Sequence, residues 1–198
     1  MTDEEITEAY AAMSAEAAEM LGTAVTAEDP DRAVIEPWAR TVPGRILDLG
    51  SGTGRWTGHL VRRGHDVEGL EPVRQLVDIA RSAHPAATFR QGRLEDLADR
   101  SDRWSGILAW YSLIHVDPAG LPAALAALGG ALEADGTVLM SYVAGPRVEP
   151  FAHPIATAYR WPPQEMARAL RRAGFEVTGA EVRGAHAWVT ARRLPSGT

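Results

Sequence analysis

Short apolar runs alternate with amphipathic stretches over most of this sequence, from Arg45 onward. Four of the runs carry little charge and have the length of buried strands. They span residues 46–49, 67–70, 107–110 and 138–143. Between them, apolar side chains recur at helical spacing in two longer stretches. Strands that alternate with helices are typical of a doubly wound, mostly parallel sheet covered by helices, so we expect an α/β fold.

The N-terminal part of the chain has a different pattern. We interpret residues 1–41 as two helices that form an entry or cap segment. Thr2 and Glu5 have the spacing of a capping box, and Asp29-Pro30 has the pattern of an N-cap followed by a first helical residue. With neither a linker nor a repeat in the sequence, we expect a single domain whose α/β core is residues 42–198.

Composition removes several classes of function. The chain has 198 residues with 45% hydrophobic and 23% charged residues, as expected for a compact globular protein. It contains neither cysteine nor lysine, which excludes thiol nucleophiles, cysteine metal sites, Schiff-base lysines and phosphate-binding loops that need a lysine. We expect no metal site. The formal charge of -6 makes a nucleic-acid partner unfavoured.

The first residues are acidic and lack the basic start and apolar run of a secretory signal. Uncharged stretches elsewhere fall short of the ~20 apolar residues that cross a bilayer. We therefore expect a cytoplasmic protein with no membrane partner. The sequence leaves a homo-oligomer open.

The most informative segment is a buried strand that runs directly into a loop with alternating glycines, Asp48-Leu49-Gly50-Ser51-Gly52-Thr53-Gly54. Glycines allow positive φ and let the backbone approach a ligand closely. The helix that follows, from about Trp56, offers unpaired N–H groups and its positive dipole end to an anion. This pattern predicts a nucleotide-like ligand, and the alternative is a purely structural turn.

A dinucleotide-binding fingerprint, G-x-G-x-x-G, is the rival interpretation of this loop. Counted from Gly50, its third glycine falls on Arg55. The sequence also lacks the Tyr-x-x-x-Lys pair or a comparable catalytic lysine. A nicotinamide-dependent oxidoreductase therefore stays only as a weaker alternative.

Glu71 ends the second predicted strand, about 20 residues after the first glycine, where an acidic side chain meets a ribose in such folds. A carboxylate at that place can accept hydrogen bonds from both ribose hydroxyls. Pro72 then starts the next crossover helix. The alternative is a solvated acid at the end of a strand.

These residues resemble class I S-adenosylmethionine-dependent methyltransferases, and the resemblance extends from Arg45 to the C-terminus. It implies a seven-stranded, Rossmann-like sheet with an antiparallel C-terminal strand at residues 186–191. It also implies S-adenosylmethionine as cofactor, with the methionine moiety on the glycine loop and the ribose on Glu71. The cofactor-binding residues expected on this basis are Tyr10, Asp48, Gly50, Ser51, Gly52, Gly54, Arg55, Trp56, Glu71, Pro72, Leu94, Glu95, Ala109, Trp110 and Tyr111.

Two later motifs of the family are less regular here. The Gly-Asp pair expected after the third strand reads Gly92-Arg93, so the usual acidic acceptor for adenine is replaced by an arginine. The Leu94 N–H still suits the adenine ring, and Glu95 or Asp96 can replace the acid. The fourth motif, at residues 106–115, resembles small-molecule methyltransferases and lacks the Asn/Asp-Pro-Pro-aromatic signature of DNA and glutamine amino-methylation.

Candidate catalytic groups are two histidines. Methyl transfer from a sulfonium needs alignment above all, and a base matters when the acceptor is a hydroxyl or a protonated amine. His115 follows the fourth strand, and His153 lies in the proline-rich loop after the fifth. Both are candidate bases, and the alternative for each is a packing or capping role. His59 and His65 are interpreted as structural or exposed.

Aromatic and basic residues complete the expected site. Tyr159 and Trp161 are candidates for substrate binding, because π faces attract cations, although core packing explains such residues equally well. Arg55 is a candidate partner of the methionine carboxylate, and the alternative is an ordinary solvated arginine. Tyr10 is expected to close over the cofactor.

These observations favour the hypothesis that the protein transfers a methyl group from S-adenosylmethionine to an oxygen or nitrogen of a small molecule. A cofactor-binding subunit that has lost turnover is the alternative outside enzymes, and Arg93 is its best support.

Overall fold

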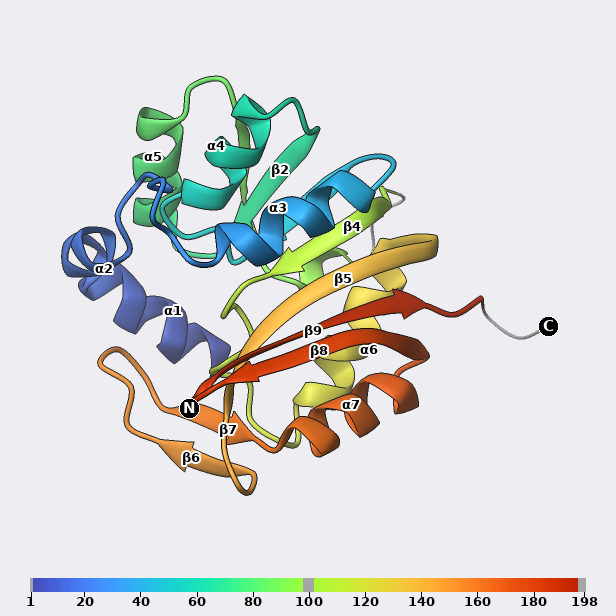
Figure 1. Ribbon diagram of the computed structural model, residues 1–198. Coiled ribbons are helices and arrows are strands. Elements are labelled where there is room, and N and C mark those ends of the chain that lie inside the picture. The colour runs from blue at the N-terminus through green and yellow to red at the C-terminus, as the bar shows by residue number, and fades with distance from the viewer. Residues whose placement is uncertain (1, 98–101, 196–198) are drawn as a thin grey trace.

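The computed structural model describes residues 2–97 and 102–195, and its N-terminal part forms three helices where the sequence predicted two. They are α1 (Asp3–Ala12), α2 (Ser14–Leu21) and α3 (Arg32–Thr41). The capping box of α1 is confirmed: the Glu5 N–H donates to Thr2 Oγ1 at 3.2 Å, and the Thr2 N–H donates to Glu5 Oε2 at 2.7 Å. Figure 1 shows α1 and α2 at one end of the strands.

The predicted start of the next helix, at Asp29-Pro30, is two residues early. α3 begins at Arg32, and Asp31 precedes it as the N-cap residue. The Asp29 carboxylate accepts the Asp31 N–H at 3.0 Å, which makes a tight turn of these residues. That local hydrogen bond competes with helix formation and delays the first helical residue.

A parallel sheet forms the centre of the molecule, as predicted. Five strands are parallel in the order β3-β2-β1-β4-β5. The C-terminal strand β9 is antiparallel to β5, and β8 pairs with β9 at the edge. These seven strands are β1 (Ile46–Leu49), β2 (Val67–Glu71), β3 (Thr88–Gln91), β4 (Trp104–Ala109), β5 (Leu132–Ala144), β8 (Phe175–Arg183) and β9 (His186–Arg193).

Helices cover both faces of the sheet. All four residues of β1 are buried, and alternate side chains supply the two faces: Leu47 packs on one and Ile46 on the other. Figure 1 shows α3 on one side of β4 and β5, with α6 and α7 on the other. The other helices are α4 (Arg55–Arg62), α5 (Arg74–Ala83), α6 (Leu121–Ala131) and α7 (Pro163–Arg172). No helix of the described residues is long and apolar enough to cross a membrane.

One part of the sheet is not in the sequence-based expectation. The segment expected as a proline-rich loop contains a hairpin of β6 (Glu149–Phe151) and β7 (Ala158–Trp161), so the described residues form nine strands rather than seven. β7 runs parallel to the last two residues of β5. The Tyr159 N–H also donates to the Ile114 carbonyl at 2.9 Å. These backbone contacts fix the hairpin beside the loop that follows β4.

Candidate functional site

A cavity of about 660 Å³ lies at the carboxyl ends of β1, β2 and β4. This is the edge of an open α/β sheet at which ligands bind. α1, the end of α2 and the β6–β7 hairpin complete its walls. The predicted site residues that line it are Tyr10, Gly50, Gly52, Glu71, Pro72, Leu94, Glu95, Trp110, Tyr111, His115 and His153. The structure thus brings together residues from most of the sequence length.

The glycine loop forms one wall of the cavity, and its glycines have different structural roles. Gly50, Gly52 and Gly54 all have positive φ, at 64°, 54° and 76°. Among the described residues, a Cβ on Gly52 would meet only Leu21, at 3.6 Å, so this position leaves room for a ligand. A Cβ on Gly54 would lie 2.6 Å from the Phe89 ring. Gly54 therefore allows packing against β3 and does not line the cavity.

Glu71 connects this loop to the end of β2. Its carboxylate accepts the Gly52 N–H at 2.8 Å and the Val73 N–H at 3.0 Å. Burial raises the pKa of Glu71 to about 7, with Asp48 adding to the shift and the two N–H donors opposing it. A buried carboxylate thus lines the cavity close to its titration point at neutral pH.

Asp48 lies under the glycine loop rather than at the cavity. Its Oδ2 accepts the Thr57 hydroxyl at 2.6 Å, which ties β1 to α4. Burial raises the pKa of Asp48 to about 6. Asp48 therefore supports the loop from below and adds negative charge behind Glu71.

Arg55 has a partner other than the cavity. Its guanidinium forms an ion pair with Asp29 and donates to the Leu21 carbonyl at 3.1 Å. The neighbouring Thr53 hydroxyl donates to the Gly22 carbonyl at 2.5 Å. Because its guanidinium is paired with Asp29, Arg55 does not line the cavity, where it was expected to bind the methionine carboxylate. The loop instead holds the end of α2 against the body of the protein.

Most of the remaining predicted residues outside the cavity lining are held by packing. Trp56 and Ala109 are buried in the two core clusters. The Ser51 hydroxyl is buried and points toward Gly69, where an added Cβ would lie 2.8 Å away. Trp161 packs against the apolar core. Strand alternation in the hairpin explains this, because it sends Arg160, rather than its neighbours Tyr159 and Trp161, toward the cavity.

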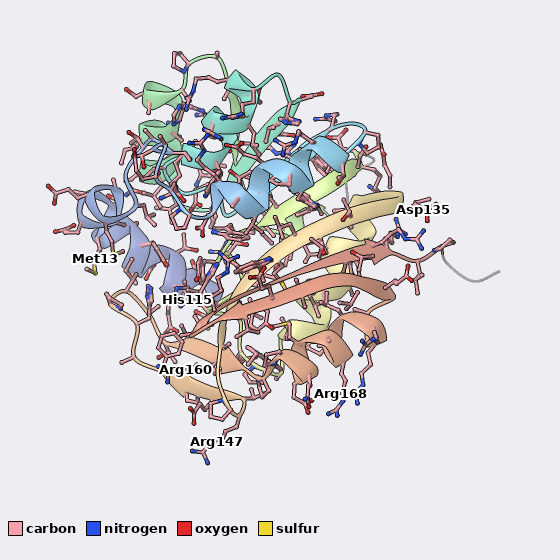
Figure 2. All side chains as sticks on the ribbon, viewed as in Figure 1. Met13, His115, Asp135, Arg147, Arg160 and Arg168 are labelled. Atoms are coloured by element: carbon pink, nitrogen blue, oxygen red, sulfur yellow. The ribbon has the colours of Figure 1, made fainter. Side chains whose placement is uncertain are left out.

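His115 follows β4 and has both ring nitrogens engaged. Nδ1 lies 2.8 Å from the Thr157 carbonyl, which can only accept, so Nδ1 carries the proton. Nε2 is then an acceptor and receives the Tyr10 hydroxyl at 2.9 Å. Burial lowers the pKa of His115 below its ordinary 6.5, although the Thr157 carbonyl opposes the shift. The ring is therefore neutral at pH 7. Figure 2 shows His115 beside α1.

Two neighbours fix the environment of His115. Burial raises the pKa of Tyr10 to about 12, and the charge of Glu71 adds to the shift, so Tyr10 stays protonated and donates. His153 packs edge-on against His115 with ring centroids 5.0 Å apart. Burial and the nearby His115 lower the pKa of His153. Both predicted histidines therefore line the cavity as neutral rings.

Sequence reasoning missed a polar cluster behind the aromatic wall. Trp110 Nε1 donates to Asp31 at 2.8 Å, and the Tyr111 hydroxyl forms a hydrogen bond with His186. His186 Nε2 lies 3.7 Å from Asp31. His186 is the first residue of the C-terminal strand and pairs with Val143 near the end of β5. Its place at this edge of the sheet could therefore be predicted from the strand pattern. No sequence signal marks Asp31.

Comparisons with known proteins agree with this geometry. A family model described as a methyltransferase domain matches residues 24–180. An uncharacterized methyltransferase of Mycobacterium bovis is 36% identical over 75 residues, which cover 38% of this chain and 31% of that protein. The ubiquinone biosynthesis O-methyltransferase of Azorhizobium caulinodans is 31% identical over 153 residues, covering 68% of this chain and 59% of that protein. The match thus spans less than a third of the first relative's length and less than two thirds of the second's.

Among solved structures, the 1,6-didemethyltoxoflavin-N1-methyltransferase of Burkholderia thailandensis has the same fold, with a TM-score of 0.78 at 22% identity. The superposition covers 97% of this chain and 88% of that one. That crystal structure contains 1,6-didemethyltoxoflavin and S-adenosylhomocysteine. At this level of identity the likeness carries the fold and no more.

Proposed function

This chain belongs to the methyltransferase domain family, and we propose that it transfers a methyl group from S-adenosylmethionine to an oxygen or nitrogen atom of a small molecule. Membership of this family supports the predicted methyltransferase class and speaks against the nicotinamide oxidoreductase alternative. The observation that carries the proposal is one continuous cavity, lined at once by the glycine loop with Glu71 and by two neutral histidines.

The cavity fits the proposed cofactor. Its volume of about 660 Å³ lies in the range of small-molecule sites. Gly50 and Gly52 present bare backbone, and the Glu71 carboxylate lies between them and the end of β2, where it can accept ribose hydroxyls. Leu94 and Glu95 line the same cavity and are the proposed neighbours of the adenine ring. When bound, S-adenosylmethionine supplies an activated methyl group on a sulfonium.

His115 is the proposed base for acceptors that must lose a proton. Its Nε2 lone pair faces the cavity side, where it now accepts the Tyr10 hydroxyl. An acceptor hydroxyl that replaces Tyr10 would donate to the same nitrogen and give up its proton there. The lowered pKa of His115 keeps the ring unprotonated at pH 7 and so ready to accept. The Thr157 carbonyl holds the required tautomer.

A methyl-transfer assay tests the proposal. S-adenosylmethionine with a labelled methyl group is incubated with the protein and pooled metabolites, and label is sought in any small-molecule product. We expect transfer with wild-type protein and its loss with Gly52→Val. Tight cofactor binding without any transfer would instead favour the second candidate, a cofactor-binding subunit. The observation that supports this candidate is the unusual Arg93 in the cavity wall.

A further inference from the structure

A single arginine lines the part of the cavity that the β6–β7 hairpin builds. Arg160 lies on β7, and its guanidinium Cζ stacks 4.5 Å from the centre of the Phe151 ring on β6. Gly145 leaves space for this side chain, because a Cβ there would lie 2.8 Å from Arg160 Cβ. The guanidinium is thus held in place by packing, with its N–H edge left over for hydrogen bonds.

Arg160 has no acidic partner among the residues that the structure describes. Glu149 lies directly opposite it across the β6–β7 pair. The Glu149 carboxylate, however, accepts from Arg147 Nε at 3.1 Å. The acid nearest along the hairpin is therefore already neutralised by a different cation, and the charge of Arg160 is available to a ligand.

The surroundings of Arg160 favour an anion. Among the described residues, the carboxylates that line the cavity are Glu71, which ends β2, and Glu95, which follows β3, and we assign both to the cofactor. On the hairpin side, the polar neighbours are His115 and His153, whose pKa values are lowered. Apolar side chains make up most of the remaining wall.

We propose that the methyl acceptor is a small, otherwise largely apolar carboxylic acid, with its carboxylate bound by Arg160 and its hydroxyl or amino group facing His115. The inference rests on the proposed function and names its substrate class. A planar guanidinium matches a carboxylate with two parallel N–H···O bonds. Because His115 and His153 are neutral, Arg160 supplies one positive charge on this side of the cavity, which matches the single negative charge of a carboxylate.

The test uses protein saturated with S-adenosylhomocysteine and matched probe pairs, 3-hydroxybenzoate against 3-hydroxybenzamide and phenylacetate against phenylacetamide. Affinities are measured by ligand-observed NMR. We expect the acids to bind wild-type protein at least about tenfold more tightly than the amides, as a charge-assisted pair implies. Arg160→Met should abolish this preference, and Arg160→Lys should keep part of it.

Arg168→Met is the matched control, because Arg168 is an exposed arginine on α7 that pairs with Glu165. Figure 2 shows Arg160 and Arg168 on different elements of the molecule. This variant should keep the acid preference. Equal affinity for acids and amides in the wild type, no binding of either, or an unchanged preference in Arg160→Met would overturn the inference. Failure to bind S-adenosylhomocysteine would instead count against the proposed function itself.

Discussion

The Tyr10 hydroxyl lies 2.9 Å from His115 Nε2 and joins the first helix to the loop after β4, across 105 residues of sequence. The contact covers the candidate base with the N-terminal helix. An acceptor hydroxyl can reach Nε2 only when Tyr10 gives up this hydrogen bond. Access of an acceptor to the candidate base therefore depends on this one side-chain pair.

Replacing His115 by glutamine separates catalysis from cofactor binding. Glutamine keeps polarity but takes up no proton, so we expect kcat to fall by about 10²–10⁴-fold, the usual contribution of a positioned base. Affinity for S-adenosylhomocysteine should not change, because the proposed role of His115 is toward the acceptor and not toward the cofactor. A loss in kcat of less than about tenfold would assign His115 to packing.

The pH dependence of kcat/KM should report the neutral form of His115 in the free protein, in which Tyr10 still donates to the ring. Burial lowers its pKa below 6.5, so activity should be constant above that value and fall as pH decreases through the lowered pKa. The Tyr10 hydroxyl donates to the neutral ring and favours that form. Tyr10→Phe should therefore shift the acid limb of the profile upward. A wild-type limb above 6.5, or one that Tyr10→Phe does not move, would contradict this assignment.

Cofactor affinity should depend on the protonation of Glu71. Its pKa is raised to about 7, chiefly by burial. Hydroxyl donors from a ribose would stabilise the carboxylate and lower that pKa, so binding below it must release a proton. Affinity should then rise by up to about tenfold per pH unit below the raised pKa and level off above it.

Titration calorimetry at about pH 6 and about pH 8 checks this dependence. Glu71→Gln serves as the control, since it cannot ionise. It should bind the cofactor more weakly and with little change between the two pH values. Equal wild-type affinity at both values would show that Glu71 does not meet the ribose.

Two glycine substitutions distinguish the ligand-facing position from the packing position. Gly52→Ala places a methyl group at the cavity wall with little protein contact, and its positive φ costs about 1–2 kcal/mol of stability. Gly54→Ala adds a clash with Phe89 and Ala80, and such overpacking costs about 1–3 kcal/mol more.

Denaturant unfolding and S-adenosylhomocysteine titration of both variants give the readout. Gly52→Ala should lose mainly affinity, and Gly54→Ala should lose mainly stability. If both variants lose the same stability while keeping full affinity, the loop is a structural turn and not a ligand wall.

Much of the fold follows from local patterns in the sequence. The apolar run at β1, the glycine spacing and Glu71 at the end of β2 are adjacent in sequence or separated by one crossover, so their relative placement is fixed by the βα unit. The antiparallel β9 at the C-terminus was likewise predicted and is confirmed.

Contacts between distant segments were not predictable in this way. Arg55 has the chemistry to bind a carboxylate, and the carboxylate it meets is Asp29, brought near by the turn before α3. The β6–β7 hairpin lacks a strong turn signal, so neither its pairing nor its alternation was expected. As a result, Tyr159 and Trp161 were predicted to bind the substrate, whereas Arg160 and Phe151 are the hairpin strand residues that line the cavity.

The most direct test of the central claim is calorimetric titration of the purified protein with S-adenosylmethionine, S-adenosylhomocysteine and NAD. The cavity of Gly50, Gly52 and Glu71 predicts saturable binding of the first two and none of NAD. Binding of NAD alone, or of none of the three, would contradict the account.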